Sequence, residues 1–284
     1  MTSPKPTAPE TPTIAEEPRG PVIEWFSIDG LEFQDAAKLL ELIDILREIR
    51  RQPGCRKVLR QDCGESSVPD FLVIEWRDAR ARTQFLESEG SQRFAQAIEG
   101  NQLRRTLLIR LPQGGGVGVF HGFADLTHNL PEVLTAHFPT SLSDTATQAL
   151  DRIGGPENFG GPMSGHEIAH PLSSPYEGLL GKHHGWADGI VEYQGQPTRR
   201  MIYIFKWLDE LAQQRYRQEA KIKKRTRDGR TLWDAMDVFL DDLEDLGMLG
   251  YETRNAKFLD VLGFYLPSDP GYAKGVNDSD TLRR

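Results

Sequence analysis

The sequence predicts an α+β protein in which one β-α-β-β-α-β unit, the ferredoxin-like order, occurs twice in diverged form. Three observations lead to this fold class. Short strand-like runs alternate with amphipathic helical segments, one strand-and-helix segment recurs without gaps, and a run of three glycines separates the two occurrences. The predicted organisation begins with a disordered tail (1–20), a first unit (21–111) and a Gly-rich linker (112–116). A second unit with two insertions (117–266) and a C-terminal tail (267–284) follow.

The first unit contains four predicted strands and two predicted helices. A helix over about residues 34–51 has apolar side chains at helical spacing and is ended by Pro53. A second helix follows the third strand and continues to about Ile98. The strands are rich in β-branched and aromatic residues, and they lie at Val22–Ile28, between Cys55 and Gly64, at Phe71–Trp76 and at Leu107–Leu111.

The repeat is most evident in one segment. Residues 71–85 align without gaps to residues 202–216. Both tryptophans in the match are interpreted as core residues that fix a strand to a helix, and Trp207 is also a candidate wall of a pocket. The matched pairs are Trp76 and Trp207, Asp78 and Asp209, and Phe85 and Tyr216.

The rest of the second unit is predicted from this match. Val117–Phe123 is its expected first strand, Leu130–Phe138 the start of its first helix, and Lys257–Leu262 its last strand. Two insertions mark this copy: a stretch rich in Gly, Pro and His at 154–185, and an amphipathic helix at 231–246. Because dense Gly and Pro oppose a long helix, the first insertion is expected to form a lid over a cavity.

Charge and composition restrict the classes of partner. The chain has 34 Lys and Arg against 42 Asp and Glu, and its net charge of −8 gives no general attraction to nucleic acid or anionic lipid. Cys55 and Cys63 are too few for a disulfide framework, and no apolar run approaches the roughly 20 residues that span a bilayer. We therefore expect a soluble cytoplasmic protein that acts on a small molecule, alone or as a homodimer.

The strand, Trp-Asp and helix pattern of the repeat resembles the antibiotic-biosynthesis-monooxygenase-like, stress-responsive A/B-barrel group of the dimeric α/β-barrel superfamily. The resemblance covers about two thirds of the chain and contains no invariant catalytic signature. It implies that the two ferredoxin-like units pair sheet to sheet as a dimeric α/β-barrel within one chain. It also implies a small-molecule pocket between sheet and helices, and cofactor-free oxygenation, cyclisation, decarboxylation or isomerisation of aromatic polyketides.

All seven histidines lie between positions 121 and 184, and imidazole is the side chain that titrates near neutral pH. Strand alternation places His121 on one sheet face with Phe123, either inside a cavity or in the core. His166 and His170 form an H-E-x-x-H pattern, which on a helix binds zinc. Because glycines before this pattern and Pro171 after it leave little helix, no metal is expected, and a divalent metal is kept as an alternative.

Residues 182–189 combine two imidazoles, an indole and a carboxylate between glycines. An Asp beside a His orients an imidazole as a base, and an indole stacks on flat aromatic molecules; a loop with a surface Trp is the alternative interpretation. The candidate catalytic residues are His121, His166, His170, His183, His184 and Asp188. The candidate substrate-binding residues are Phe123, His128, Trp186 and Trp207.

The resulting hypothesis is an enzyme without an organic cofactor that acts on a small aromatic or polyketide-like molecule by histidine acid–base catalysis. His121 and a histidine of the predicted lid would form its proton-transferring pair. Two alternatives stay open. One is a haem-dependent enzyme, because chlorite-dismutase-like and aldoxime-dehydratase-like proteins pair similar units and use a proximal His. The other is a non-catalytic small-molecule-binding or stress-response protein.

Overall fold

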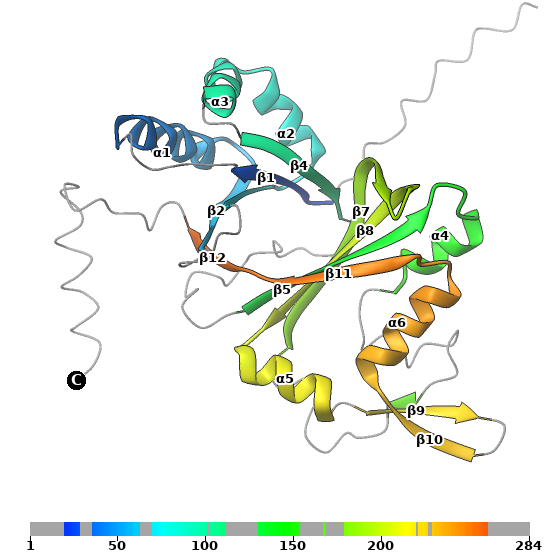
Figure 1. The fold of residues 1–284 in the computed structure, drawn as a ribbon. Helices are drawn as coiled ribbons and strands as arrows, with labels where there is room; N and C mark the ends of the chain where they lie inside the picture. Colours follow the sequence, from blue (N-terminus) through cyan, green and yellow to red (C-terminus); the bar gives the residue numbers. More distant parts are fainter. Residues whose placement is uncertain are drawn as a thin grey trace, which may run out of the picture.

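The computed structural model shows an α+β fold, as predicted (Figure 1). The described residues form a nine-stranded antiparallel sheet, a separate three-stranded sheet and six helices. No helix within these residues combines the length and apolar character needed to cross a membrane. The description covers residues 20–28, 36–62, 70–100, 103–111, 130–153, 167–168, 179–219, 221–226 and 229–260.

The first half of the chain has the predicted order of elements. Its strands lie in the order β4-β1-β3-β2 in the large sheet. The predicted second helix is divided into two, because Ser88 interrupts it with a hydroxyl that donates to the Phe85 carbonyl at 2.7 Å. The elements are β1 (Val22–Ile28), α1 (Ala36–Arg51), β2 (Cys55–Asp62), β3 (Asp70–Trp76), α2 (Ala79–Leu86), α3 (Glu89–Gly100) and β4 (Leu103–Arg110).

The second half contributes the remaining strands of the large sheet in the order β11-β5-β8-β7. The small sheet has the order β10-β9-β6 and lies beside α5 and α6 (Figure 1). The elements are β5 (Leu130–Pro139), α4 (Asp144–Leu150), β6 (Glu167–Ile168), β7 (Leu179–Tyr193), β8 (Gln196–Trp207), α5 (Glu210–Glu219), β9 (Lys221–Thr226), β10 (Gly229–Asp234), α6 (Ala235–Asp245), β11 (Gly250–Asn255) and β12 (Lys257–Asp260).

Several predicted elements of the second half are wrong. Leu130–Phe138 is not a helix but most of β5, and most residues of that strand are buried, on both of its faces. Such a strand shows no polar alternation, so its periodicity does not separate it from a helix. The predicted helix at 231–246 begins only at Ala235, after β10. Residues 179–185 of the predicted lid belong to the long strand β7.

Several other expectations fall outside the described residues. They are the N-terminal tail up to residue 19, the linker at 112–116, the strand at 117–123, the remaining lid residues 154–166 and 169–178, and the C-terminal tail.

The chain joins the two ends of the strand order. β11 pairs with β5 at one end, β12 pairs with β2 at the other, and only Ala256 separates these two strands. Figure 1 shows them as one long orange strand that runs past both halves. The predicted last strand of the second half is therefore corrected: Lys257–Asp260 pairs with the first half, and Gly250–Asn255 takes the outer position in the second. The large sheet curls because this one segment reaches both of its ends.

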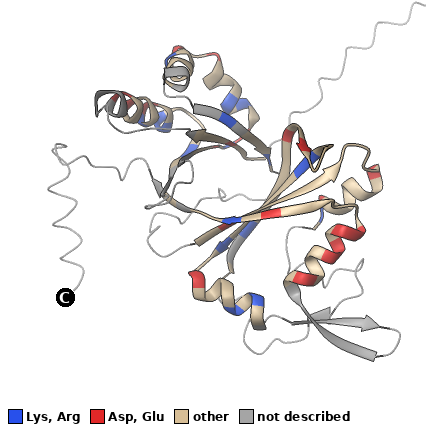
Figure 2. Cartoon of the chain, in the orientation of Figure 1, with Lys and Arg blue, Asp and Glu red and all other residues tan. Residues whose placement is uncertain are grey.

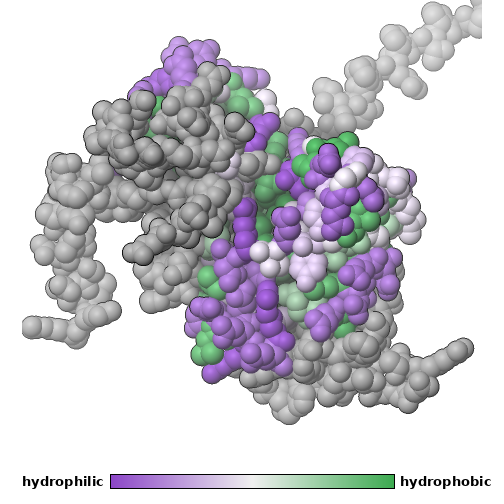
Figure 3. All heavy atoms as spheres, viewed as in Figure 1, coloured by the Kyte–Doolittle hydropathy of each residue, from purple (hydrophilic) through white to green (hydrophobic). Residues whose placement is uncertain are grey.

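Apolar side chains fill both faces of the curled sheet. In β1, Val22 and Phe26 pack with the helices of the first half, whereas Ile23 and Trp25 enter a core shared by both halves. A third core lies between the second half's strands and helices. Figure 3 shows the consequence on one face: hydrophilic residues dominate the surface of the second half and hydrophobic ones form small patches. Figure 2 shows acidic residues along α6, whose other side packs through Phe239 and Leu243.

Candidate functional site

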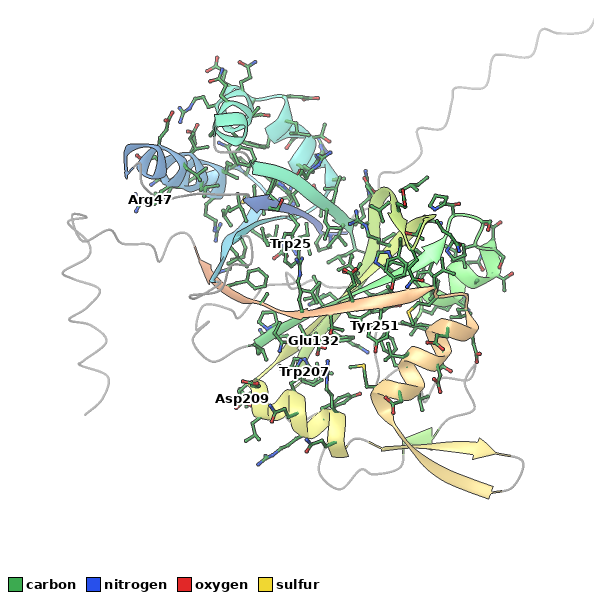
Figure 4. All side chains as sticks on the ribbon, viewed as in Figure 1. Trp25, Arg47, Glu132, Trp207, Asp209 and Tyr251 are labelled. Atoms are coloured by element: carbon green, nitrogen blue, oxygen red, sulfur yellow. The ribbon has the colours of Figure 1, made fainter. Side chains whose placement is uncertain are left out.

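A tryptophan in each half donates a hydrogen bond to a buried glutamate. Nε1 of Trp76 lies 2.8 Å from Oε2 of Glu24. Nε1 of Trp207 lies 2.8 Å from Oε2 of Glu132, and Figure 4 labels this second pair. All four side chains are buried. Because Trp207 makes the same contact as its counterpart in the other half, its position is explained by packing without any pocket.

Each buried glutamate also has a cationic partner, but the two halves supply it differently. In the first half Arg82 pairs with Glu24 at 2.9 Å. The matched residue in the second half is Gln213, whose amide donates to Glu132 at 2.7 Å. The positive charge comes from Arg217, one helical turn later. The same buried charge is thus balanced in both halves, as a structural role requires.

The other matched pairs of the repeat are structural as well. Asp78 and Asp209 each cap the following helix by accepting a backbone N–H at 2.7 Å. Phe85 and Tyr216 each pack on the tryptophan of their own half, with ring centroids 5.1 and 5.0 Å apart. The predicted equivalence of segments 71–85 and 202–216 is therefore confirmed at the level of side-chain contacts.

Strands β2 and β7 can be matched in the same way. Each begins opposite the tryptophan of its neighbouring strand, and each shows a register shift directly afterwards, within residues 55–57 and 179–181. The next residue on β2 is Val58 and the next on β7 is Lys182. On β3 and β8, Leu72 and Tyr203 occupy the matched position four residues before the tryptophan.

Polar side chains replace apolar ones at these matched positions of the second half. Lys182 and Tyr203 stand where the first half has Val58 and Leu72, both of which are buried in an apolar core. The polar residues lie on the face of β7 and β8 that carries the helices, because their cross-strand neighbours belong to the core on that face. His184 lies on the same face, with its ring stacked near that of Tyr203 at a centroid distance of 5.8 Å.

Asp151, directly after α4, binds two side chains of β7. Its carbonyl oxygen lies 3.0 Å from Nε2 of His184, and its Oδ1 accepts from Nε1 of Trp186 at 2.8 Å. Trp186 also lies under the guanidinium of Arg199, 4.3 Å from the ring centroid. We use the name β7–β8 cluster for Lys182, His184, Trp186, Tyr203 and Asp151.

The contact with Asp151 fixes the tautomer of His184. A carbonyl oxygen only accepts hydrogen bonds, so Nε2 of His184 carries the hydrogen in the neutral ring. Nδ1 is then the nitrogen that can take up a proton. Burial lowers the pKa of His184 below its ordinary value, and the nearby positive charge of Lys182 acts in the same direction, against the opposing effect of Asp151. The imidazole is therefore neutral at pH 7 and able to act as a base.

The lysine of the cluster also has a shifted protonation equilibrium. Burial lowers the pKa of Lys182 to about 8, so the ammonium form persists at neutral pH and is lost just above it. In contrast, burial raises the pKa of Tyr203, so its hydroxyl stays protonated over the whole physiological range. The cluster thus combines a neutral base, a cation and a hydroxyl donor beside a half-buried indole.

His183 does not belong to the cluster, although it is next to His184. It lies opposite Ile204, on the sheet face that contributes to the shared core. Burial lowers the pKa of His183 to about 4, and two neighbours, His184 in its protonated form and Lys206, act in the same direction. The two histidines, both predicted as catalytic, are on opposite faces of the sheet and cannot act on one substrate atom.

Among the described residues Asp188 pairs with an arginine, and the expected pairing with His183 or His184 is not seen there. The two carboxylate oxygens of Asp188 accept from Nε and Nη2 of Arg110 at 3.2 and 3.0 Å. This pair links β7 to β4, at the junction of the two halves. Asp151, which comes from another element, takes the place beside His184.

The structure does not describe the remaining candidate residues. His121, Phe123, His128, His166 and His170 all lie outside the described residues, so their roles stay predictions. Within the ranges that the structure describes, no three His, Cys, Asp or Glu side chains are grouped so as to hold a metal ion.

Sequence reasoning missed three members of the cluster: Asp151, Lys182 and Tyr203. One local signal was available for Asp151, since an acidic residue at the C-terminal end of a helix opposes the helix dipole and calls for a tertiary partner. Tyr203 stands inside the matched segment, where its counterpart Leu72 shows the exchange of an apolar for a polar side chain.

Comparisons with known proteins give a likeness of fold. No family model matches the chain, and no curated protein matches its sequence. A provisionally named monooxygenase from Lactobacillus acidophilus is 6% identical with a TM-score of 0.46, and 84% of this chain and 94% of that chain are covered. A similarly named protein from Fusobacterium nucleatum is 10% identical with a TM-score of 0.47, and the match covers 85% of this chain and 97% of that chain. An anthrone oxidase-like protein is 15% identical with a TM-score of 0.48, and the match covers 87% of this chain and 95% of that chain. Likenesses of this degree assign no activity to this chain, so its function must come from its own residues.

Proposed function

We propose that the chain is a fused dimeric α/β-barrel, in which two ferredoxin-like units share one curled sheet. When the four large-sheet strands of each half are numbered in chain order, they lie across the sheet as fourth, first, third and second in both halves. Both halves show the same register shift after the start of their second strand and the same Trp–Glu hydrogen bond. The continuous pair β11 and β12 supports closure, because it binds strands at both ends of the sheet.

We propose further that only the second unit carries the active site, at the β7–β8 cluster. The observation that carries this proposal is the polarity difference between matched positions: Lys182 and Tyr203 against Val58 and Leu72. The apolar pair shows that the fold does not require polar groups there. Since removing a polar group from water costs free energy, the presence of half-buried Lys182 and buried Tyr203 in one half only is explained best by a function of that half.

The function that this cluster supports best is that of an oxygenase-type enzyme acting on a small, flat aromatic molecule. Trp186 offers an aromatic surface, and Nδ1 of His184 is placed as the base that removes a proton from an acidic C–H or O–H group. The ammonium of Lys182, two residues away on the same strand face, stabilises the resulting anion.

The proposed reaction needs no external reductant. With anthrone as a model substrate, His184 takes one proton from the methylene carbon, and the electron-rich anion passes its electrons to molecular oxygen. One oxygen atom becomes the new carbonyl oxygen of anthraquinone, and the other leaves as water with the two methylene hydrogens. The chain's own residues supply the base, the cation and the aromatic surface for this conversion.

Oxygen uptake with anthrone tests the proposal. The unchanged protein should consume one O₂ per anthrone faster than buffer, and His184→Gln should lower the rate by about 10²–10⁴-fold, the usual contribution of a general base. His183→Gln is the matched control, because it changes the neighbouring residue on the opposite sheet face, and it should keep the rate. An equal loss in both variants would contradict the assignment. A Soret band in the purified protein would favour the haem alternative, and binding without oxygen uptake would favour a binding protein.

A further inference from the structure

The hydroxyl of Tyr203 is buried without a hydrogen-bond partner among the described residues. The side chain is fully buried in the middle of β8, and its hydroxyl oxygen is enclosed. Its ring packs edge-on against the ring of Phe239, with centroids 5.1 Å apart, and parallel to the ring of His184, with centroids 5.8 Å apart. Buried hydroxyls are nearly always paired, since an unpaired one loses its bonds to water. A partner that binds at this position would therefore satisfy it.

The hydroxyl lies near the proposed base. The carboxylate of Asp151 is close enough to raise the pKa of Tyr203 by its charge, in addition to the larger effect of burial. The same Asp151 holds His184 and Trp186. A group that accepts a hydrogen bond from Tyr203 would thus lie beside the imidazole and the indole.

The fold itself does not require this hydroxyl. Leu72, at the matched position of the first half, is buried in a core of apolar side chains. Another buried tyrosine, Tyr216, packs its ring on the tryptophan of its own half in the same way as its counterpart Phe85, so ring packing accounts for that position. At Tyr203 the described contacts give no structural reason for a hydroxyl.

We propose that Tyr203 donates a hydrogen bond to an oxygen atom of the substrate, and that the substrate is accordingly a flat aromatic molecule with a ring carbonyl or phenolate oxygen. This inference rests on the proposed function and names its substrate class. The hydroxyl is protonated at all physiological pH values and acts only as a donor to such an oxygen. It stabilises the negative charge that reaches this oxygen when His184 removes a proton elsewhere on the conjugated ring system.

The test compares two ligands that differ only in this oxygen. Anthrone has the carbonyl, and 9,10-dihydroanthracene has the same three-ring frame without it. Binding is measured in the absence of O₂, so that no turnover occurs, for the unchanged protein and for Tyr203→Phe. The unchanged protein should prefer anthrone, and Tyr203→Phe should reduce that preference on the order of 3- to 10-fold, the net value of one hydrogen bond. Tyr216→Phe is the matched control and should keep the preference.

Thermal unfolding of the ligand-free variants provides a second, independent readout. Because Tyr203→Phe removes a hydroxyl that has no hydrogen-bond partner within the described part of the chain, its melting temperature should stay unchanged or rise by up to about 5 °C. A fall of several degrees would show a structural partner and overturn the inference, as would an unchanged preference for anthrone. If Tyr203→Phe behaves as expected but the unchanged protein consumes no O₂ with anthrone, the proposed function fails and the donor role stands. Absence of anthrone binding to the unchanged protein would overturn both.

Discussion

At the scale of single residues, the decisive property is the sheet face on which a side chain lies. His183 and His184 are adjacent in sequence, yet one meets the shared core and the other meets Tyr203 and Asp151. The sequence predicted that this motif carries chemistry but could not choose between the two rings. That choice depends on the register shift at the start of β7 and on Asp151, which comes from a different element.

The protonation states of His184 and Lys182 predict the pH dependence of oxygen uptake. Burial lowers the pKa of His184 below the ordinary value of a histidine, so the rate should hold at neutral pH and fall only in more acidic solution, where the imidazole takes up a proton. It should also fall as pH rises through about 8, where Lys182 loses its proton. Lys182→Met should remove the alkaline decline of kcat/KM and keep the acidic one. An alkaline decline that survives in this variant would rule out the lysine as its origin.

The two buried glutamates predict unequal losses of stability. Glu24→Gln leaves Arg82, whose side chain is only 14% exposed, without its counter-charge, and should lower the free energy of unfolding by about 3–5 kcal/mol. Glu132→Gln affects Arg217, which is 44% exposed and can turn to water, so about 1–3 kcal/mol is expected. Urea unfolding of both variants checks the order. A larger loss for Glu132→Gln would refute the explanation by exposure of the arginine.

At the scale of elements, local pattern predicted the strand-and-helix segment of both halves and failed at β5 and β12. The repeat 71–85 and 202–216 is correct because each tryptophan, cap and aromatic residue acts within its own half. β5 was taken for a helix because burial on both faces removes the alternation of a strand. The partner of β12 could not be predicted, since pairing with β2 in the other half leaves no local trace.

The junction of β4 and β7 depends on a glycine. A Cβ atom at Gly185 would lie 2.3 Å from the carbonyl oxygen of Arg110, so the backbones approach too closely for any side chain. Gly185→Ala should force the strands apart and lower the free energy of unfolding by about 1–3 kcal/mol. Gly90→Ala in α3 is the matched control, since a Cβ there meets atoms only at 3.5 Å or more. It should be neutral or stabilising by about 0.5–1 kcal/mol in the same chemical denaturation measurement, and equal losses would contradict the close approach.

At the scale of the whole molecule, one core contains residues of both halves, and we expect the two halves to unfold as one cooperative unit. Phe258 on β12 packs edge-on against Trp25 of the first half, with ring centroids 5.6 Å apart, and both are fully buried. Arg254 on β11 lies over the same indole at 4.8 Å. Phe258→Ala should lower the free energy of unfolding by about 3–5 kcal/mol within a single transition. Two separate transitions in fluorescence and circular dichroism of the unchanged protein would show that the halves unfold independently.

The central claim is that polar residues of the second half serve function while the fold accepts apolar ones in their place. The most direct test is oxygen uptake with anthrone by the double variant Lys182→Val/Tyr203→Leu, which gives the second half the residues of the first. We predict that this variant stays folded, with a melting temperature no lower than that of the unchanged protein, and that its oxygen uptake falls to the rate in buffer. Uptake equal to that of the unchanged protein, or a variant that does not fold, would contradict the claim.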